Sequence, residues 1–483
     1  MPSATIREGW PTWEWQVEAT RAFYSAPVTG LRRFVHVINR QHGKTALAEA
    51  LLLREAREKP GNYAFFAPTY DRSEEVYTEL CIALADLIQE KLVVPKATKA
   101  GWVLRFSPKY TKGGKHAAIH LKSLANPEHL RGQTLRGMVI DEAGYVVGTT
   151  WRQVLQPMLL QLDGWAWFIG TPPDPESCND PHFFKTIAER AGLHFVRNEN
   201  GERECIKGPA EPRWWGIHRD YTRIPNQRVV REIEAEKEHT PTEEFDREYR
   251  ALFTDDQVFR LPPLRFWGPN SDIKALPDGL VVSTGVDLAD NEQELGDKAA
   301  TVTWGTAAGG YVYVFGGEYY RNPGEVLDSL YAHRALYHTS RIRLQKSSFD
   351  KGFRFTVQAA EPTRGFLPVE LTTIGGSSKR RRILQMEPIA RAGKLIVHED
   401  FREFMKEWES FPDGLIGPRK RNRMTHHYDI LDAASPMVED AMTFSTWVPK
   451  EEPAPNSAAA LSKALRMRAK GIGSHRIQDT YRF

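Results

Sequence analysis

The sequence is poor in cysteine, and its three cysteines, Cys81, Cys178 and Cys205, lie far apart. Structural zinc sites and disulfide frameworks need cysteines at short, paired spacings, so we expect neither, and the scarcity fits a reducing compartment. The chain also lacks an apolar run near the ~20 residues that a membrane-spanning helix requires. Its first ten residues have no apolar core of the kind found in a secretory signal. These absences predict a soluble protein of the cytoplasm that does not bind a membrane.

The sequence has no marked excess of either charge. Its 65 Lys and Arg residues stand against 62 Asp and Glu residues, for a net charge of +3. This balance does not by itself indicate nucleic-acid binding, although basic segments can be hidden within it. No internal repeat is present in the sequence. The chain has 483 residues, which is too long for one ordinary core, so we expect two or three domains.

Residues 1–256 alternate short apolar segments with longer segments rich in Ala, Leu, Glu and Arg. This alternation predicts a parallel α/β sheet covered by helices. The end of the region, about 210–256, is densely charged and predicts a small helical subdomain. Gly and Pro clusters over 257–277 then indicate a linker between domains.

Residues 278–449 follow a second pattern. Three successive apolar segments predict strands that are antiparallel to one another, at 281–286, 300–304 and 311–315. A helix, another strand ending at Asp350, and a final helix over about 428–444 complete the pattern, which indicates a mixed sheet. Residues 450–483 are rich in Pro, Ala, Ser and Arg and predict a flexible basic tail.

The first chemical motif is Gly43-Lys44-Thr45, which follows an apolar segment and has the composition of the end of a phosphate-binding loop. The standard loop has another glycine five residues before Gly43, where this sequence has Ile38. The chemistry is nevertheless retained. Glycine lets the backbone approach phosphate, Lys44 can reach the β- and γ-phosphates, Thr45 can bind magnesium, and a predicted helix follows directly.

Asp141 and Glu142 end a second apolar segment and strengthen the case for a nucleoside triphosphate site. A carboxylate on a neighbouring strand holds magnesium, and an adjacent one can activate water. Near the first motif, Arg40 and Gln41 are either solvated or part of the nucleotide site, with Arg40 adding positive charge over the phosphates. Gln16 is either a surface residue or reads an adenine edge through its amide.

Four aspartates in the second region suggest further chemistry: Asp287, Asp350, Asp429 and, one helical turn later, Asp432. Two-metal cleavage of a phosphodiester needs carboxylates that converge from different elements. Hard oxygen ligands of this kind suit Mg²⁺ or Mn²⁺. Each aspartate alone could equally sit in a turn or cap a helix. Their order, at two strand ends and then a helix start, favours a nuclease.

Together these motifs resemble those of the large terminase subunits of tailed bacteriophages. The resemblance extends from residue 13 to about 444 and includes an adenine-reading segment, a deviant Walker A, an arginine segment, a Walker B, a coupling motif and a final acidic motif, at 13–16, 39–45, 130–132, 140–143, 168–173 and 428–433. The family's final motif begins with two aspartates, and Tyr428 replaces the first of them here.

The resemblance implies an N-terminal P-loop ATPase domain of the RecA/ASCE-like type and a C-terminal RNase H-like nuclease domain. In the first domain it implies that ATP and Mg²⁺ are held by Gly43, Lys44, Thr45 and Asp141, and that Glu142 is the general base.

It also implies that Thr171 senses the γ-phosphate and couples its loss to the rest of the motor. An arginine finger acting on a neighbouring subunit would be Arg131 or, as the alternative, Arg136; we prefer Arg131.

In the second domain the resemblance implies that Asp287, Asp350 and Asp429 hold two Mg²⁺ or Mn²⁺ ions, with Asp432 as a helper. A basic run nearby is either the solvated start of a helix or a DNA-binding segment with salt-sensitive affinity, and consists of Lys379, Arg380, Arg381 and Arg382.

The function implied is ATP-driven translocation of double-stranded DNA into a prohead, with metal-dependent cutting of concatemeric DNA. The implied partners are a portal protein, a small terminase subunit and further copies of the chain in a ring. The protein would act in the host cytoplasm, docked transiently on the prohead and absent from the virion.

Two alternatives remain. A helicase or repair translocase with a fused nuclease would need a second RecA-like domain, of which the sequence after residue 255 has no sign. A non-cutting DNA-binding ATPase is disfavoured by the retention of the aspartates.

Overall fold

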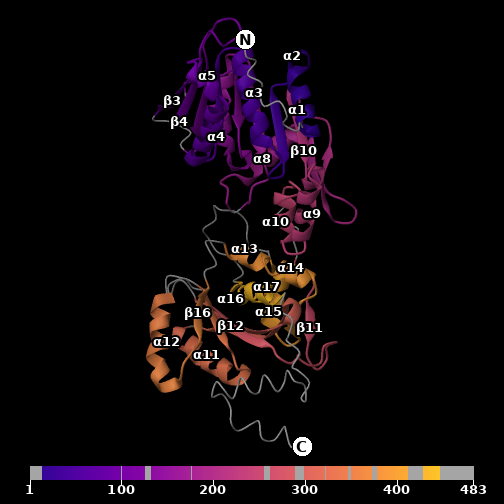
Figure 1. Ribbon diagram of the computed structural model, residues 1–483. Helices are drawn as coiled ribbons and strands as arrows, with labels where there is room; N and C mark the ends of the chain where they lie inside the picture. Colours follow the sequence, from indigo (N-terminus) through magenta and orange to yellow (C-terminus); the bar gives the residue numbers. More distant parts are fainter. Residues whose placement is uncertain are drawn as a thin grey trace, which may run out of the picture. The chain divides into compact units, whose positions relative to one another are not determined.

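The computed structural model describes residues 13–98, 101–125, 132–175, 177–254, 261–288, 299–320, 322–345, 350–372, 378–411 and 428–445. The chain divides into two compact units (Figure 1). The first comprises Met1–Pro262, Gly375–Pro388 and Lys406–Tyr428, and the second comprises Pro263–Ile374, Ile389–Met405 and Asp429–Phe483. Within the described residues, we find no helix with the length and apolar character needed to cross a membrane.

The first unit is built around an eight-stranded sheet with the order β10-β1-β7-β6-β2-β5-β4-β3. Its strands are β1 (Arg33–Ile38), β2 (Asn62–Ala67), β3 (Val93–Thr98), β4 (Gly101–Phe106), β5 (Ala117–Ser123), β6 (Gly137–Ile140), β7 (Trp165–Gly170) and β10 (Trp214–Arg219). All neighbours from β10 to β5 are parallel, whereas β4 is antiparallel to β5 and β3. One strand, β7, separates β1 from β6, which is the RecA/ASCE-like arrangement and confirms the expected fold class.

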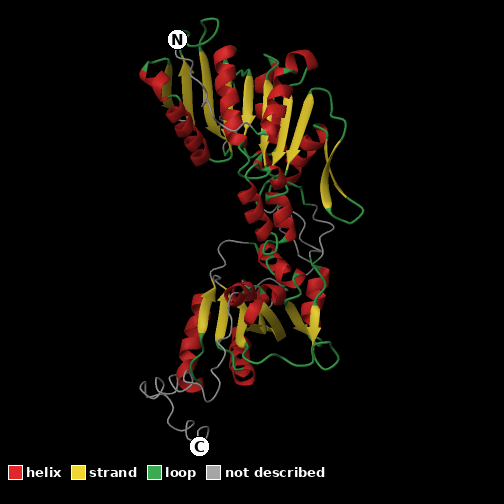
Figure 2. Ribbon diagram, turned by 45° about the vertical axis from the view of Figure 1, so that its right-hand side comes forward, coloured by secondary structure: helices red, strands yellow, loops and turns green. Residues whose placement is uncertain are grey.

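Helices pack on both faces of this sheet (Figure 2). The helices are α1 (Glu14–Tyr24), α2 (Ala26–Thr29), α3 (Lys44–Glu58), α4 (Tyr70–Ala83), α5 (Ala85–Gln89), α6 (Gly148–Thr150), α7 (Pro157–Leu160) and α8 (Pro181–Arg190), with a short 3-10 helix η2 (Ala143–Tyr145) and a short π-helix η3 (Trp151–Leu155). Alternate residues of β1 divide between the two cores: Phe34 and Ile38 pack with α1 and α3, while Val35 and Val37 pack with α8. Strands buried on both faces read as continuous apolar segments, which is why the sequence revealed them.

The end of the first unit is mostly helical. It contains β8 (Leu193–Arg197), β9 (Arg203–Lys207), η4 (Tyr221–Arg223), α9 (Gln227–Glu236) and α10 (Thr242–Glu248). Tyr221, Ile224 and Phe245 form a small separate core for η4, α9 and α10. The preceding strand β10 lies within the segment expected to be a helical subdomain, but it is hydrogen-bonded to β1 in the main sheet.

The second unit contains a seven-stranded mixed sheet with the order β11-β17-β14-β13-β12-β15-β16. Its strands are β11 (Arg265–Trp267), β12 (Val281–Asp287), β13 (Ala299–Ala307), β14 (Tyr311–Tyr320), β15 (Arg341–Gln345), β16 (Val369–Thr372) and β17 (Leu395–His398). The strands β12, β13 and β14 are successive and antiparallel, as expected. In addition, β15 is parallel to β12. The order from β14 to β16 is that of an RNase H-like fold.

Helices also pack on the second sheet. They are α11 (Pro323–Tyr337), α12 (Asp350–Arg364), α16 (Asp429–Ala434) and α17 (Met437–Ser445). Two short helices, α13 (Lys379–Leu384) and α14 (Glu387–Arg391), precede β17, and α15 (Arg402–Ser410) follows it. The single final helix expected over about 428–444 is in fact two helices. Pro436 separates them because proline has no backbone N–H to donate to the preceding turn.

Candidate functional site

The loop between β1 and α3 has the geometry of a phosphate site. Gln41 and Gly43 both adopt left-handed backbone conformations, with φ of 57° and 71°, and Gly43 caps the amino end of α3. The Lys44 ammonium donates hydrogen bonds to the carbonyl oxygens of Ile38 (2.9 Å) and Asn39 (2.8 Å). Burial lowers the Lys44 pKa, while Glu142 and Asp141 oppose that shift. A buried cation therefore lies beside the free N–H groups of a helix, an arrangement that favours an anion.

The start of α1 contacts this loop. The Gln16 amide donates to the Gly43 carbonyl oxygen at 3.2 Å, and the Gln16 side-chain oxygen accepts from the Trp13 backbone N–H at 3.1 Å. The Trp13 and His42 rings meet edge to face, with centroids 4.6 Å apart, and the His42 ring hydrogen-bonds to Asn39. Gln16 is thus adjacent to the loop, as its expected role requires, while adenine recognition stays a prediction.

Asp141 and Glu142 lie directly after β6, at the sheet edge where the loop after β1 also emerges. Because β1, β7 and β6 are parallel neighbours, their carboxyl ends share this edge. The Asp141 side chain is buried, with 1% of its surface exposed. Burial and the neighbouring Glu142 raise the Asp141 pKa to about 6, against the opposing effects of Arg72 and Lys44. Glu142 itself has a φ of 47°, an uncommon conformation for a residue other than glycine.

Arg72 also belongs to this site, although the sequence analysis did not identify it. It lies in the first turn of α4, a helix capped by Thr69 directly after β2. Its guanidinium donates to the Thr45 hydroxyl (3.2 Å), lies 3.5 Å from an Asp141 carboxylate oxygen, and donates to Glu75 (2.9 Å). The sequence offers one indirect signal for Arg72. The helix that carries it starts at the end of β2, and β2 is the parallel neighbour of β6, the strand that leads to Asp141.

Arg40 and Gln41 lie on the exposed part of the loop. The Arg40 guanidinium forms an ion pair with Glu248 at the end of α10, at 2.5 Å. The positive charge expected over the phosphates is therefore paired with an acidic side chain of the helical end of this unit. Contact of Arg40 and Gln41 with nucleotide stays a prediction.

Thr171 follows β7 and is buried, with 5% of its surface exposed. The preceding Gly170 packs closely on the acidic turn, which we define as Asp141 to Ala143. A Cβ added at Gly170 would lie 3.0 Å from the Ala143 nitrogen. The position of Thr171 is compatible with the coupling role expected of it, which stays a prediction.

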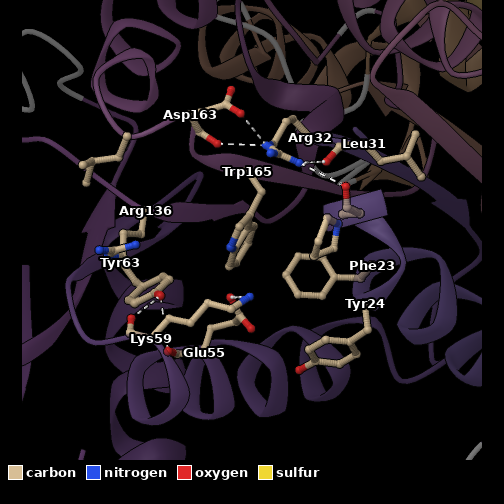
Figure 3. Close-up of a pocket in the computed structure, with 13 residues that line it drawn as sticks. Phe23, Tyr24, Leu31, Arg32, Glu55, Lys59, Tyr63, Arg136, Asp163 and Trp165 are labelled. Atoms are coloured by element: carbon tan, nitrogen blue, oxygen red, sulfur yellow. Dashed lines mark hydrogen bonds and ion pairs between the residues drawn. The ribbon is translucent and has the colours of Figure 1, made fainter. Parts of the chain in front are cut away.

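Of the two arginine-finger alternatives, Arg131 lies outside the described residues, whereas Arg136 lies at the start of β6. Arg136 is therefore at the opposite end of that strand from Asp141. There it lines a pocket with Tyr63, Lys59 and Trp165 (Figure 3).

In the second unit, the residues expected to bind metal lie around the ends of β12 and β15. Asp287 is the last residue of β12, and Asp429 and Asp432 lie on α16, each with 2% of its surface exposed. The Gln345 amide, at the end of β15, donates to the Asp432 backbone carbonyl and lies 3.4 Å from its carboxylate. Because β12 and β15 are parallel neighbours, their ends bring Asp287 and α16 to one edge of the sheet.

A metal cluster at this edge stays a prediction. The expected strand ending at Asp350 is wrong: β15 ends at Gln345, and Asp350 begins α12, where only its backbone is described. Among the described residues no group of three or more His, Cys, Asp or Glu side chains lies close enough together to hold an ion. A further buried acid, Asp440 on α17, accepts from the Trp304 indole at 3.1 Å and pairs with Arg343, so it has a structural role that the sequence did not suggest.

The basic run begins α13, where the Ser378 hydroxyl caps the Arg381 backbone N–H. Arg380 is not available at the surface: 6% of it is exposed, and its guanidinium pairs with Glu243 of α10 at 2.7 Å. Arg381 is half exposed and lies 3.6 Å from Glu244. The structure thus gives Arg380 a buried ion pair, while DNA contact by Lys379, Arg380, Arg381 and Arg382 stays a prediction.

Comparison with curated proteins finds relatives among phage terminases. No family model matches the chain. The large terminase subunit of Thermus virus P23-45 is 30% identical over 150 residues, and that of Thermus phage G20c is 29% identical over 151 residues. Each match covers 29% of this chain and 31% of the relative, so the chain spans about a third of the length of the curated relatives it matches. The resemblance to large terminases is therefore confirmed.

The solved structures that resemble this chain include large terminases and a yeast mitochondrial Holliday junction resolvase. The large terminase of a thermophilic bacteriophage gives a TM-score of 0.47 at 13% identity, covering 90% of this chain and 100% of that one. The ATPase domain of the Thermus phage P74-26 large terminase gives a TM-score of 0.40 at 23% identity, covering 51% and 95%.

Proposed function

We propose that this chain is the large terminase of a tailed phage, an ATPase that moves double-stranded DNA into a prohead and a metal-dependent endonuclease that cuts concatemeric DNA. The observation that carries the proposal is the loop after β1. There Lys44 is buried against the loop carbonyls at the start of α3, and Asp141 and Glu142 emerge at the same sheet edge. The match to the two Thermus phage subunits supports the same function.

The residues present fit a magnesium ion bound with ATP. The Thr45 hydroxyl and the Asp141 carboxylate are hard oxygen ligands, and both lie close to one cationic group, the guanidinium of Arg72. Magnesium, when bound, would neutralise charge on the β- and γ-phosphates. Lys44 would bind the same phosphates, and Glu142 would take the proton from the attacking water. Thr171, next to the acidic turn, would respond to loss of the γ-phosphate.

In the proposed nuclease site, Asp287, Asp350 and Asp429 would hold two Mg²⁺ or Mn²⁺ ions, with Asp432 as a helper. The shared edge of β12 and β15 supports this set, as does the position of α16 beside Gln345. When bound, the ions would activate a water molecule and stabilise the leaving oxygen of the cut phosphodiester. The aspartates would orient the ions, and Lys379, Arg381 and Arg382 of the basic run would add contacts to phosphate, whereas Arg380 is held in its buried ion pair with Glu243.

The wider assembly belongs to the same proposal. The proposed ATPase domain covers residues 1–256, the nuclease domain covers 278–449 and a tail covers 450–483. The segment 257–277, expected to be a linker, contributes β11 to the second sheet. Both curated relatives are named large subunits, which supports a smaller partner subunit. We further propose a portal protein as docking partner, a ring of chains in which Arg131 serves the neighbouring site, and action in the host cytoplasm, on the prohead but not in the virion.

Plasmid cleavage with Mn²⁺ tests the proposal, with the wild type compared with Asp350→Ala and Lys44→Ala. We expect Asp350→Ala to abolish cleavage and keep ATP hydrolysis, and Lys44→Ala to do the reverse. A folded wild-type protein that cuts no DNA would contradict the nuclease assignment and favour a non-cutting DNA-binding ATPase. The helicase alternative has less support, because the described part of the second unit has an RNase H-like sheet rather than a second RecA-like one.

A further inference from the structure

Arg72 connects the two oxygen groups to which the proposed function assigns magnesium. One guanidinium nitrogen donates to the Thr45 hydroxyl at 3.2 Å, and another lies 3.5 Å from the Asp141 carboxylate. Thr45 belongs to α3 and Asp141 follows β6, so a residue from a third element, α4, bridges them. A guanidinium in this position uses the same oxygen atoms that a divalent cation would need.

The charge around Asp141 explains why a cation is favoured there. Asp141 is almost fully buried and is followed directly by Glu142, so its negative charge is poorly solvated and repelled by a neighbour. Lys44 does not form an ion pair with it in this arrangement, since its ammonium is bound to the loop carbonyls. Arg72 supplies the compensating positive charge through a direct ion pair.

The same side chain has an alternative partner on its own helix. Its third nitrogen donates to Glu75, one turn along α4, at 2.9 Å. Arg72 keeps 35% of its side-chain surface exposed, so it lies at the border between the site and solvent. If Arg72 moved away from Asp141 and Thr45, its guanidinium would therefore keep one ion pair, the one with Glu75.

We propose that Arg72 competes with the nucleotide-bound metal ion for Thr45 and Asp141, and so sets the metal concentration at which the site fills. Arg72 is then a positioning residue whose displacement accompanies metal binding and whose return assists metal release. The inference rests on the proposed function, because it requires the nucleotide and its metal to bind at this loop.

Binding of Mn²⁺ at saturating ADP tests the proposal without any need for catalysis. Free Mn²⁺ is measured by electron paramagnetic resonance as the metal is titrated into wild type and Arg72→Gln, both carrying Asp350→Ala so that the ions assigned to the nuclease site do not contribute. We expect the half-saturating Mn²⁺ concentration to fall about two- to fivefold in the variant, the range for loss of one partly exposed competing ion pair. A fluorescent ADP analogue, titrated in chelator without metal, should bind the variant no more tightly than wild type.

Two further variants separate the effect of the Arg72 guanidinium from the effect of losing a positive charge. Arg105→Gln removes the same charge from an exposed position on β4 and should leave both titrations unchanged. Arg72→Lys keeps the charge but loses the forked guanidinium, so it should fall between wild type and Arg72→Gln. If Arg72→Gln does not fold, Arg72→Lys provides the test, because the proposal predicts that its half-saturating Mn²⁺ concentration is also lower than that of wild type.

The outcomes separate the inference from the function on which it rests. An unchanged or higher metal requirement in Arg72→Gln overturns the inference, since a residue that only holds α4 or only binds phosphate would give that result. A cooperatively folded wild type that binds neither ADP nor Mn²⁺ instead overturns the proposed nucleotide site itself.

Discussion

Glu142 has an unusual backbone for a residue with a proposed catalytic role. Its left-handed conformation, with a φ of 47°, is costly for a side chain of this size, and such conformations cluster at functional sites. We predict that Glu142→Gln lowers ATP hydrolysis by about 10²- to 10⁴-fold, because the amide cannot accept the proton from water. Binding of a fluorescent ADP analogue should be retained. Phosphate release within a few-fold of wild type would show that another group is the base.

Glu49 makes the stability of the folded protein depend on pH. It lies on α3, one turn after Thr45, and burial together with the nearby Glu79 raises its pKa from 4.5 to about 8. The folded protein therefore holds this proton more tightly than the unfolded chain does. The stability that this provides is complete below pH 4.5 and is lost as the pH rises to about 8.

We predict that Glu49→Gln gains melting temperature relative to wild type as the pH rises from about 5 to about 8, with no further gain above that. Thermal unfolding at a series of pH values measures this difference, and Glu74→Gln, at an exposed position of α4, is the matched control. A difference that stays constant across the series would argue against the raised pKa.

At the scale of elements, the contact between β12 and α16 is decided by a glycine. A Cβ added to Gly285 would lie 1.9 Å from the Ala433 carbonyl oxygen, so α16 can approach the strand only because no side chain is present. We predict that Gly285→Ala displaces α16 or destabilises the fold by about 1–3 kcal/mol. Since α16 carries Asp429 and Asp432, DNA cleavage should fall much more than ATP hydrolysis.

Gly316→Ala on β14 is the control for this change, because an added Cβ there meets no atom within 4 Å. The two variants are compared by plasmid cleavage, phosphate release and melting temperature. Equal behaviour of the two would mean that the close approach of α16 does not matter for cleavage.

The sequence predicted those elements whose pattern is local. Strands such as β2 and β6 are buried on both faces, so a largely apolar segment marks each one. It did not predict β3, an edge strand with polar and exposed residues, or the break at Pro436 in the final helix.

Contacts between distant segments could not be predicted in the same way. The loop residues Lys44 and Thr45 are recognisable because the motif is contiguous. By contrast, Arg72 reaches Asp141, and Arg380 pairs with Glu243 across 137 positions of sequence, only through tertiary packing. No local pattern distinguishes such arginines from the many that are solvated.

At the scale of the whole molecule, the proposed ring predicts that hydrolysis is shared between neighbouring chains. Arg131→Ala would have an intact nucleotide site but no finger, and Lys44→Ala would have the finger but no working site. We predict that each variant alone is nearly inactive, that mixing them restores part of the ATPase activity, and that wild-type activity per chain rises with protein concentration. Phosphate release measures all three. Activity that is independent of concentration and is not restored by mixing would exclude a finger acting in trans.

The edge-to-face contact between Trp13 and His42 gives the protein an optical reporter. His42 lies in the phosphate loop, and burial and Lys44 lower its pKa to about 4, so its ring is uncharged near neutral pH. An indole is sensitive to the group that packs on it, and any adjustment of the loop around a phosphate would move that group. The difference in emission between wild type and Trp13→Phe therefore isolates one tryptophan among thirteen and follows the loop in real time, without an added dye.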